Sequence, residues 1–164
     1  MKQHLLAVTA LTSFLGFSLG ASAATQTATL DVSVDVGGAC SVSTTGIAFS
    51  YDSNVNTTAN GDVTVTCTTG TPYNIALDAG LHYSGGYRHV SDGTNTLQYV
   101  LGKDVSIGFE WGDSDYDNTY AFGSSLPDTG TGVAQPHTVY GLLYETPSAP
   151  TGTYTDVVTV TVYY

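Results

Sequence analysis

The chain has 164 residues, with fourteen Asp and Glu against three Lys and Arg, and a formal net charge of −11. A surface of this sign repels phosphate backbones, so the composition excludes a nucleic-acid-binding protein. Few residues are charged at all, yet β-branched and aromatic residues are abundant, and this combination excludes an intrinsically disordered chain.

The first 23 residues have the three parts of a cleavable secretory signal. Lys2 provides the positive start, residues 5–19 form an apolar run without an acidic residue, and Ala21-Ser22-Ala23 fits the small-x-small cleavage pattern. A membrane anchor is the alternative, but the run is short, interrupted by Thr, Ser and Gly, and lacks a basic flank. We expect cleavage after Ala23, export to the periplasm, and a mature chain of one domain.

The two cysteines, Cys40 and Cys67, are expected to pair with each other in an oxidising compartment. Closing the loop between them would stabilise the fold by about 3–4 kcal/mol in the chain-entropy model. Two thiols cannot form a zinc or iron–sulfur site by themselves, and neither lies in a CxxC motif. We therefore expect a structural disulfide and no cofactor.

Apolar and polar residues alternate through most of the mature chain, and no stretch shows convincing helical periodicity. Turn residues such as Asn60-Gly61 and Asp92-Gly93 separate the alternating runs. Many short strands without a helical segment predict an all-β fold, specifically a β-sandwich. In chain order, the main expected strands cover residues 28–36, 62–67, 73–78, 96–101, 105–111, 138–144 and 156–164.

The first and last expected strands each present one apolar face. The first ends at Gly37-Gly38, a flexible joint directly before Cys40. An open apolar edge at either end of a sandwich can pair with another chain. Periodicity alone nevertheless favours two strands that complete the domain's own sheets. The apolar residues are Ala28, Leu30, Val32, Val34 and Val36 in the first strand, and Val158, Val160, Val162 and Tyr164 in the last.

Several motifs occur in an order that is typical of one family. They begin with Gly38-Ala39-Cys40-Ser41-Val42 and continue with residues 61–67, residues 71–80 and Trp111-Gly112-Asp113. The most specific part is Thr-Val-Tyr-Gly at 138–141 followed by Gly-Thr-Tyr-Thr-Asp-Val-Val-Thr-Val-Thr-Val at 152–162. In this order the chain resembles the spore coat protein U domain family, which includes subunits of archaic (Csu-type) chaperone–usher pili.

The resemblance implies an incomplete immunoglobulin-like β-sandwich over residues 39–164, preceded by a donor strand and joint over residues 24–38. Pilus subunits of this kind insert an N-terminal strand into the groove of a neighbour, which is donor-strand complementation. Five buried apolar side chains would contribute on the order of 10 kcal/mol before ordering costs. On this basis Ala28, Leu30, Val32, Val34 and Val36 are donor residues, while Val158, Val160, Val162 and Tyr164 line the acceptor edge.

Asp113, Asp115 and Asp117 stand at alternate positions and invite a calcium hypothesis. An EF-hand loop requires Gly at its sixth position and Glu at its twelfth, where this chain has Asn118 and Ser124. We therefore expect a solvated acidic loop and no metal site.

No catalytic motif accompanies the histidines of the mature chain. His82, His89 and His137 are scattered, and neither a GxSxG motif nor a P-loop occurs in residues 24–164. We expect that the protein is not an enzyme. Aromatic side chains in turn-rich segments can stack on sugars, although capping the ends of the core is the simpler interpretation. These residues are Tyr83, Tyr87, Tyr116 and Tyr120.

The function that these inferences favour is a structural pilus subunit that supports attachment and biofilm formation. A periplasmic chaperone would hold it, and an outer-membrane usher would exchange the chaperone for the N-terminal strand of another copy or a related subunit. The length leaves no room for a separate binding domain, which favours a shaft subunit without stable membrane insertion. The alternative is a non-polymeric secreted coat or carbohydrate-binding protein of the same fold.

Overall fold

The computed structural model describes residues 26–116, 123–144 and 146–164. The chain divides into two units, Met1–Asp35 and Val36–Tyr164, and all strands of the described residues belong to the second. The predicted signal, residues 1–23, lies outside the described part. The described residues contain no helix, and hence none long and apolar enough to cross a membrane.

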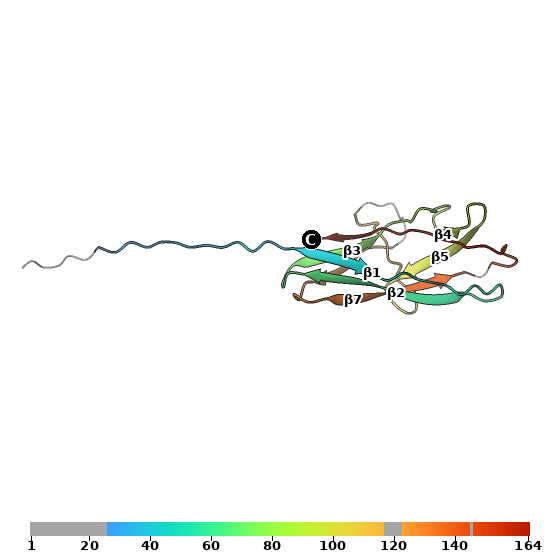
Figure 1. Ribbon diagram of the computed structural model, residues 1–164, viewed down its shortest axis with the longest axis horizontal. Helices are drawn as coiled ribbons and strands as arrows, with labels where there is room; N and C mark the ends of the chain where they lie inside the picture. The colour runs from blue at the N-terminus through green and yellow to red at the C-terminus, as the bar shows by residue number, and fades with distance from the viewer. Residues whose placement is uncertain (1–25, 117–122, 145) are drawn as a thin grey trace, which may run out of the picture. The chain divides into compact units, whose positions relative to one another are not determined.

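Two antiparallel sheets form the second unit (Figure 1), which confirms the predicted all-β fold. The larger sheet has the strand order β1-β2-β7-β5-β4, and the smaller has the order β6-β3-β8. β1 and β8 are therefore edge strands. The strands are β1 (Cys40–Thr44), β2 (Thr57–Cys67), β3 (Pro72–Leu77), β4 (Arg88–Ser91), β5 (Thr96–Gly102), β6 (Leu126–Thr129), β7 (Gln135–Leu143) and β8 (Val160–Tyr163).

The core lies between the two sheets and follows from the alternation in the sequence. Val63, Val65 and Cys67 of β2 point inward and are almost fully buried, while the residues between them are partly exposed. Trp111 is fully buried, and its indole N–H donates to the Ile75 carbonyl at 2.8 Å. This bond satisfies the single polar group of the largest core side chain.

Arg88, at the start of β4, is fully buried. Its guanidinium donates to three backbone carbonyls, those of Leu77, Asp78 and Trp111, at distances of 2.5–2.9 Å. The planar fork of the guanidinium carries enough donors to reach three carbonyls at once. Arg88 thereby joins the end of β3 to the Trp111 segment and to β4 of the other sheet.

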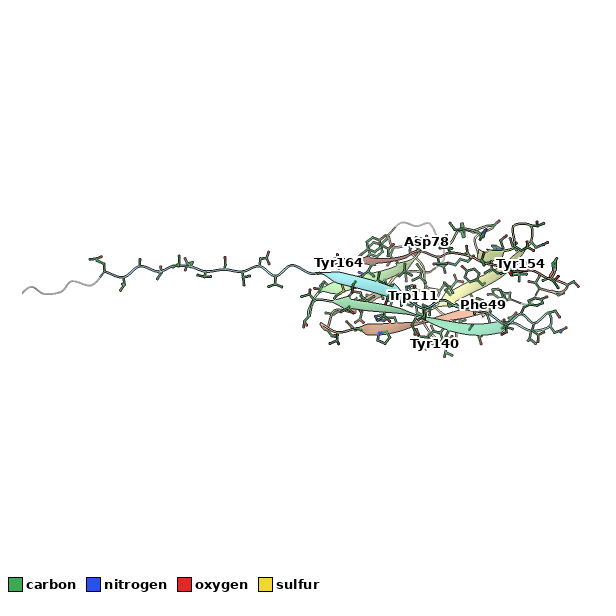
Figure 2. All side chains as sticks on the ribbon, in the orientation of Figure 1. Phe49, Asp78, Trp111, Tyr140, Tyr154 and Tyr164 are labelled. Atoms are coloured by element: carbon green, nitrogen blue, oxygen red, sulfur yellow. A yellow bond between two sulfur atoms is a disulfide. The ribbon has the colours of Figure 1, made fainter. Side chains whose placement is uncertain are left out.

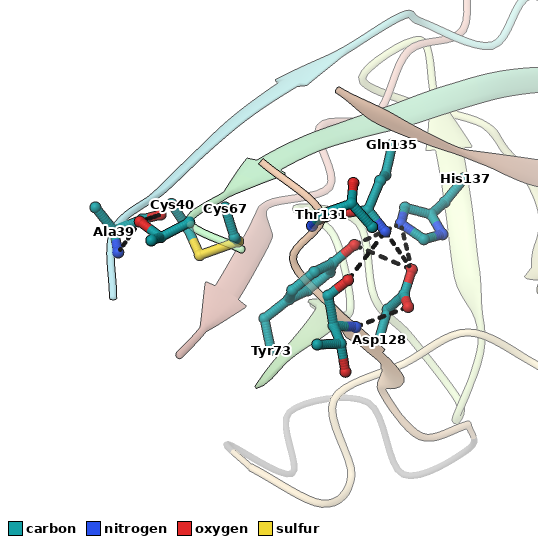
Figure 3. The surroundings of a disulfide bond; sticks show 10 residues. Ala39, Cys40, Cys67, Tyr73, Asp128, Thr131, Gln135 and His137 are labelled. Carbon is teal, nitrogen blue, oxygen red and sulfur yellow. Dashed lines mark hydrogen bonds and ion pairs between the residues drawn. A yellow bond between two sulfur atoms is a disulfide. The ribbon is translucent and has the colours of Figure 1, made fainter. Parts of the chain in front are cut away.

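The predicted disulfide between Cys40 and Cys67 is confirmed (Figure 3), with an S–S distance of 2.04 Å. The two residues lie directly opposite each other on β1 and β2. The bond thus fastens an edge strand whose sole partner among the described strands is β2. Near this end, the Tyr73 hydroxyl lies 3.1 Å from the Asp128 carboxylate and 3.0 Å from His137 Nε2. Burial and the neighbouring carboxylate raise the pKa of Tyr73 to about 12.

One expected strand was wrong. Residues 105–111 form a turn, with isolated bridges only at Glu110 and Trp111. The Asp104 carboxylate accepts from the backbone N–H and the hydroxyl of Ser106, and the Ile107 N–H donates to the Asp104 carbonyl. These local bonds compete with a sheet ladder, and they place Ile107 at a positive φ of 53°.

Other strands differ from expectation in their extent. β2 begins five positions earlier than expected, at Thr57, because its first half pairs with β7. The short strands β4 and β6 lie in segments without a clear alternating pattern. Residues 26–36 pair with no strand in this structure.

The four-residue turn between β4 and β5 depends on one carboxylate. Asp92 Oδ1 accepts from the backbone N–H groups of Thr94 at 2.8 Å and Asn95 at 2.6 Å. Asp92 Oδ2 accepts from the Asn95 side-chain amide at 3.0 Å. These hydrogen bonds, chiefly those from Asn95, lower the pKa of Asp92 to about 2.

Replacing the buried guanidinium should destabilise the fold strongly. Arg88→Met removes the donors of three buried carbonyls, and we expect a loss of about 3–5 kcal/mol in the free energy of unfolding. Urea unfolding of the exported protein measures this loss. Lys103→Met is the control, because water can replace the Lys103 ammonium, which is only partly buried. Equal losses in the two variants would contradict the role given to Arg88.

The Asp92 turn predicts a pH dependence. The pKa of Asp92 is depressed in the folded state, so its ionised form stabilises the protein above the ordinary value of about 4, and this stabilisation disappears as the pH falls towards 2. The stability difference between the native protein and Asp92→Asn should therefore be larger at pH 6 than at pH 2.5. Thermal unfolding at the two pH values tests this, and a difference that does not change with pH would refute it.

Candidate strand-acceptor groove

A groove with a volume of about 540 Å³ opens between the two sheets. Its floor is the apolar core itself, including Val63 of β2, Tyr99 of β5 and Val139 of β7. One rim is formed by residues 44–49, which start at the last residue of β1, and the other by residues 152–160, which end at the first residue of β8. Ile47, Phe49, Val158 and Val160 pack against the core from these rims and remain only partly buried.

The two rims run in opposite directions along the domain. At one end, Gly38 before β1 and Tyr164 after β8 line a common hollow with residues 68–72. Figure 2 shows Tyr164 near this end and Phe49 and Tyr154 in the other half of the domain. The groove therefore extends along the domain between two antiparallel rims.

The outer edge of β8 is unpaired along this groove. The Asp78 N–H donates to the Thr159 carbonyl at 3.1 Å, and β8 continues this ladder with β3 up to the pair of Asn74 and Tyr163. Because bonded residues alternate in an antiparallel ladder, Thr159, Thr161 and Tyr163 point their backbone groups towards β3. The backbone groups of Val158, Val160 and Val162 then point to the open side. No described strand pairs with β8 on that side.

The edge of β1 shows the same pattern on the opposite rim. Backbone bonds join Thr68 to Ala39 at 2.9 Å and Thr45 to Asp62 at 2.8 Å. The odd-numbered residues of β1 therefore bond to β2, and the backbone groups of Cys40, Val42 and Thr44 point away from it. In the described part of the chain, β2 is the sole partner of β1. An inserted strand would find unused donors and acceptors on both rims.

The rim before β8 is held in place by a buried carboxylate. The side chain of Asp156 is 3% exposed and accepts from the Tyr99 hydroxyl at 2.6 Å. It also accepts from the backbone N–H groups of Leu81 and His82 at 2.9 and 3.2 Å, and it lies 3.0 Å from His82 Nδ1. Burial, followed by this carboxylate, raises the pKa of Tyr99 well above its usual range.

Two further contacts fix the same rim. Thr155 and Ser91 exchange two backbone hydrogen bonds of 2.9 Å, which attach the rim to β4. Gly80 passes so close to Asp156 that an added Cβ would lie 2.3 Å from Oδ2, and its φ of +76° also favours glycine. The rim is therefore fastened to β4, to Tyr99 of β5 and to the loop after β3.

The predicted donor residues are exposed in this structure. The side chains of Leu30, Val32 and Val34 are 85–87% exposed, and that of Val36 is 73% exposed. Side chains of this type are ordinarily buried, and four of them alternate within seven residues. The segment therefore presents an apolar face that lacks a partner within this chain's described contacts.

The predicted acceptor residues occupy different places. Val158 and Val160 line the groove, whereas Val162 packs against the core beyond it. Tyr164 is 66% exposed and lines the hollow beside residues 68–72. No role in the site was expected from the sequence for the opposite rim, residues 44–49, or for the Asp156 network. The small apolar run Ile47-Ala48-Phe49 was the one available signal.

The remaining candidate residues are dispersed. Asp115 accepts from the N–H and hydroxyl of Ser125, and Asp113 is buried, while Asp117 and Tyr120 lie outside the described residues. Among residues that the structure describes, no group of three His, Cys, Asp or Glu could hold a metal ion. The rings of Tyr116 and Tyr163 stack with their centroids 3.9 Å apart. Tyr83 and Tyr87 are exposed, and His89 lies in β4.

Known proteins share both the sequence pattern and the fold. Protein U of Myxococcus xanthus is 33% identical over 182 residues, which cover 99% of this chain and 97% of that protein. A similar fold occurs in the CsuC–CsuE chaperone–tip adhesion subunit pre-assembly complex from the archaic chaperone-usher Csu pili of Acinetobacter baumannii. That match has a TM-score of 0.59 and 21% identity, and covers 79% of this chain and 40% of the other. The Spore Coat Protein U domain model matches residues 26–161, and the chain belongs to this family.

Proposed function

We propose that the protein is a structural subunit of an archaic chaperone–usher pilus, and that it polymerises when residues 26–36 of one copy enter the groove of another. The observation that carries this proposal is the groove itself. Partly buried apolar side chains line the two rims, and the β1 and β8 edges that continue these rims have no partner strand on that side among the described residues. A missing strand would cover both sets of groups. Insertion of an extended segment supplies both missing sets of contacts.

The N-terminal segment has the pattern that this groove requires. Its apolar residues alternate with Thr29, Asp31, Ser33 and Asp35, so one face can enter the core while the other stays in water. Residues 28–36 of the segment and residues 152–160 of the rim contain the same number of residues, so the segment is long enough to follow this rim. Two Asp residues on the outward face keep the uninserted segment soluble.

Burial of the apolar face provides the driving force. The side chains of Leu30, Val32 and Val34 are largely exposed now, and each contributes about 1.5–3 kcal/mol when it is fully buried. With Val36 and Ala28, the total is on the order of 10 kcal/mol before the cost of ordering the segment. The new backbone hydrogen bonds to β8 and β1 fix the direction and register of the inserted strand, but they contribute less of the free energy of insertion than apolar burial does.

An inserted strand antiparallel to β8 would yield a filament. Its last residue, Val36, would emerge beside Tyr154, and the donor's own domain would follow at that end through Gly37-Gly38. Each subunit would then contact the next through opposite ends. Contacts of this head-to-tail type do not close between two copies and therefore propagate.

Export and assembly of such a subunit require partners. An incomplete sandwich with an open apolar groove would aggregate, so a periplasmic chaperone would cover the groove until an outer-membrane usher catalyses the exchange. The solved complex with a similar fold contains a chaperone and a pilus subunit, which supports this role. The assembled pilus would lie at the cell surface and support attachment and biofilm formation. Its role would be structural rather than enzymatic.

A non-polymeric coat protein is the second candidate function. The observation in its favour is the similarity to Protein U over nearly the full length of both chains. In this case the exported protein would be secreted as a single subunit. Deleting the genes of its chaperone and usher separates the two candidates, since only a pilus subunit would disappear from the cell surface.

A charge introduced on the apolar face of the donor segment tests polymerisation. Val32→Asp places a carboxylate in the apolar groove, and we expect fibre yield to fall at least about tenfold, because an unpaired buried carboxylate costs several kcal/mol. Ser33→Asp is the matched control, since the neighbouring residue faces water in the same strand. Electron microscopy and heat-resistant ladders on gels measure the yield.

Both variants should still reach the periplasm and bind the chaperone, because neither changes the groove. Normal fibres from Val32→Asp, or equal defects in Val32→Asp and Ser33→Asp, would contradict insertion of this segment.

A further inference from the structure

The groove has two possible occupants of the same sequence, residues 26–36 of the same chain or of a second copy. We propose that the short joint Gly37-Gly38 excludes the chain's own segment by register, so that the segment which fits the groove comes from a second copy. This rests on the proposed function, because it assumes that the groove accepts this segment.

The chain is fixed immediately after the joint. Ala39 accepts a backbone hydrogen bond from Thr68 at 2.9 Å, and its own N–H donates to the Thr68 hydroxyl at 3.2 Å. Gly38 lies against Thr71, where an added Cβ would be 2.8 Å from Cγ2. Any return of the segment along β1 must therefore be made by a loop that ends at Ala39.

The direction of the Ala39 backbone groups excludes a two-residue hairpin. In a two-residue hairpin at Gly37-Gly38, Val36 and Ala39 would exchange backbone hydrogen bonds. The N–H and carbonyl of Ala39 already bond to Thr68 on the opposite side. The first residue of β1 with backbone groups on the groove side is Cys40, which must form the closing pair.

A four-residue loop closes on Cys40 with the wrong face inward. With residues 36–39 in the loop, Asp35 lies opposite Cys40, and opposite residues share a face of the sheet. Cys40 packs against the core, so Asp35, Ser33 and Asp31 would enter the groove and the apolar residues would face water. Two carboxylates in an apolar groove oppose this arrangement strongly.

Loops of neighbouring lengths are also unfavourable. A three-residue loop pairs Val36 with Cys40, but its usual geometry requires a positive φ at Ala39, and among the described non-glycine residues only Ile107 and Ser148 have one. A five-residue loop restores the correct face, but it moves Val36 out of the groove into the loop. A segment from another copy escapes these limits, because no short joint ties it to β1.

A one-residue insertion changes the register and tests the proposal. An extra glycine between Gly37 and Gly38 lets a four-residue loop pair Val36 with Cys40 and Val34 with Val42, with the apolar face inward. The matched control carries its extra glycine between Gln26 and Thr27, which lengthens the segment equally but leaves the spacing of the joint unchanged.

Each oxidised full-length protein is refolded at submicromolar concentration with a fluorescent peptide of residues 26–36. We expect the native protein and the control to bind the peptide, and to polymerise when concentrated without it. The joint insertion should remain monomeric and bind the peptide at least about tenfold less, because a tethered segment acts at a millimolar effective concentration. Size-exclusion chromatography and fluorescence anisotropy measure both properties.

Two results would overturn the proposal. One is that the native protein stays monomeric and does not bind the peptide. The other is that the variant with the joint insertion polymerises and binds the peptide as the native protein does. The triple variant Leu30→Ser, Val32→Ser, Val34→Ser cannot fill its own groove and should bind the peptide. If this variant fails to bind, the groove is not a strand acceptor, and the proposed function fails with it.

Discussion

The structure depends on one feature, an apolar core that the two sheets leave uncovered along the line between β1 and β8. Along this line the half-buried side chains of Val158 and Val160 face Ile47 and Phe49 across the groove. The edges of β1 and β8, which continue these rims, carry backbone groups without a strand partner in the described chain. Apolar burial and backbone pairing are normally completed together by one strand, and here both are incomplete at the same place.

Cross-links on both sides of this opening hold the two sheets in place. The disulfide of Cys40 and Cys67 fastens β1 to β2, and Asp156 fastens the opposite rim to Tyr99 and to the loop after β3. Arg88 joins the two sheets on the closed side. An edge strand that is paired on one side only frays easily, and these cross-links supply restraints that the missing strand would otherwise provide. A preformed groove lowers the cost of inserting a strand.

Much of the fold could be predicted because its information is local. Alternation in residues 62–67 and 73–78 predicted buried strands, and the isolated pair of cysteines predicted the disulfide. The strand expected at 105–111 was wrong because the side chain of Asp104 captures the following N–H groups. The rim of residues 44–49 and the role of Asp156 could not be predicted, since both depend on contacts with residues that are distant in sequence, such as Tyr99. The order of motifs, rather than periodicity, indicated a groove.

The open edge of β8 can be measured directly at its backbone. Hydrogen exchange of single amides, compared between lone subunits and assembled fibres, measures which groups lack a partner. We predict that the N–H groups of Val158, Val160 and Val162 exchange rapidly in lone subunits and become protected in fibres. Those of Thr161 and Tyr163 should be protected in both states, because they bond to β3. Equal protection of both sets in lone subunits, or no gain in fibres, would contradict a groove completed by a second copy.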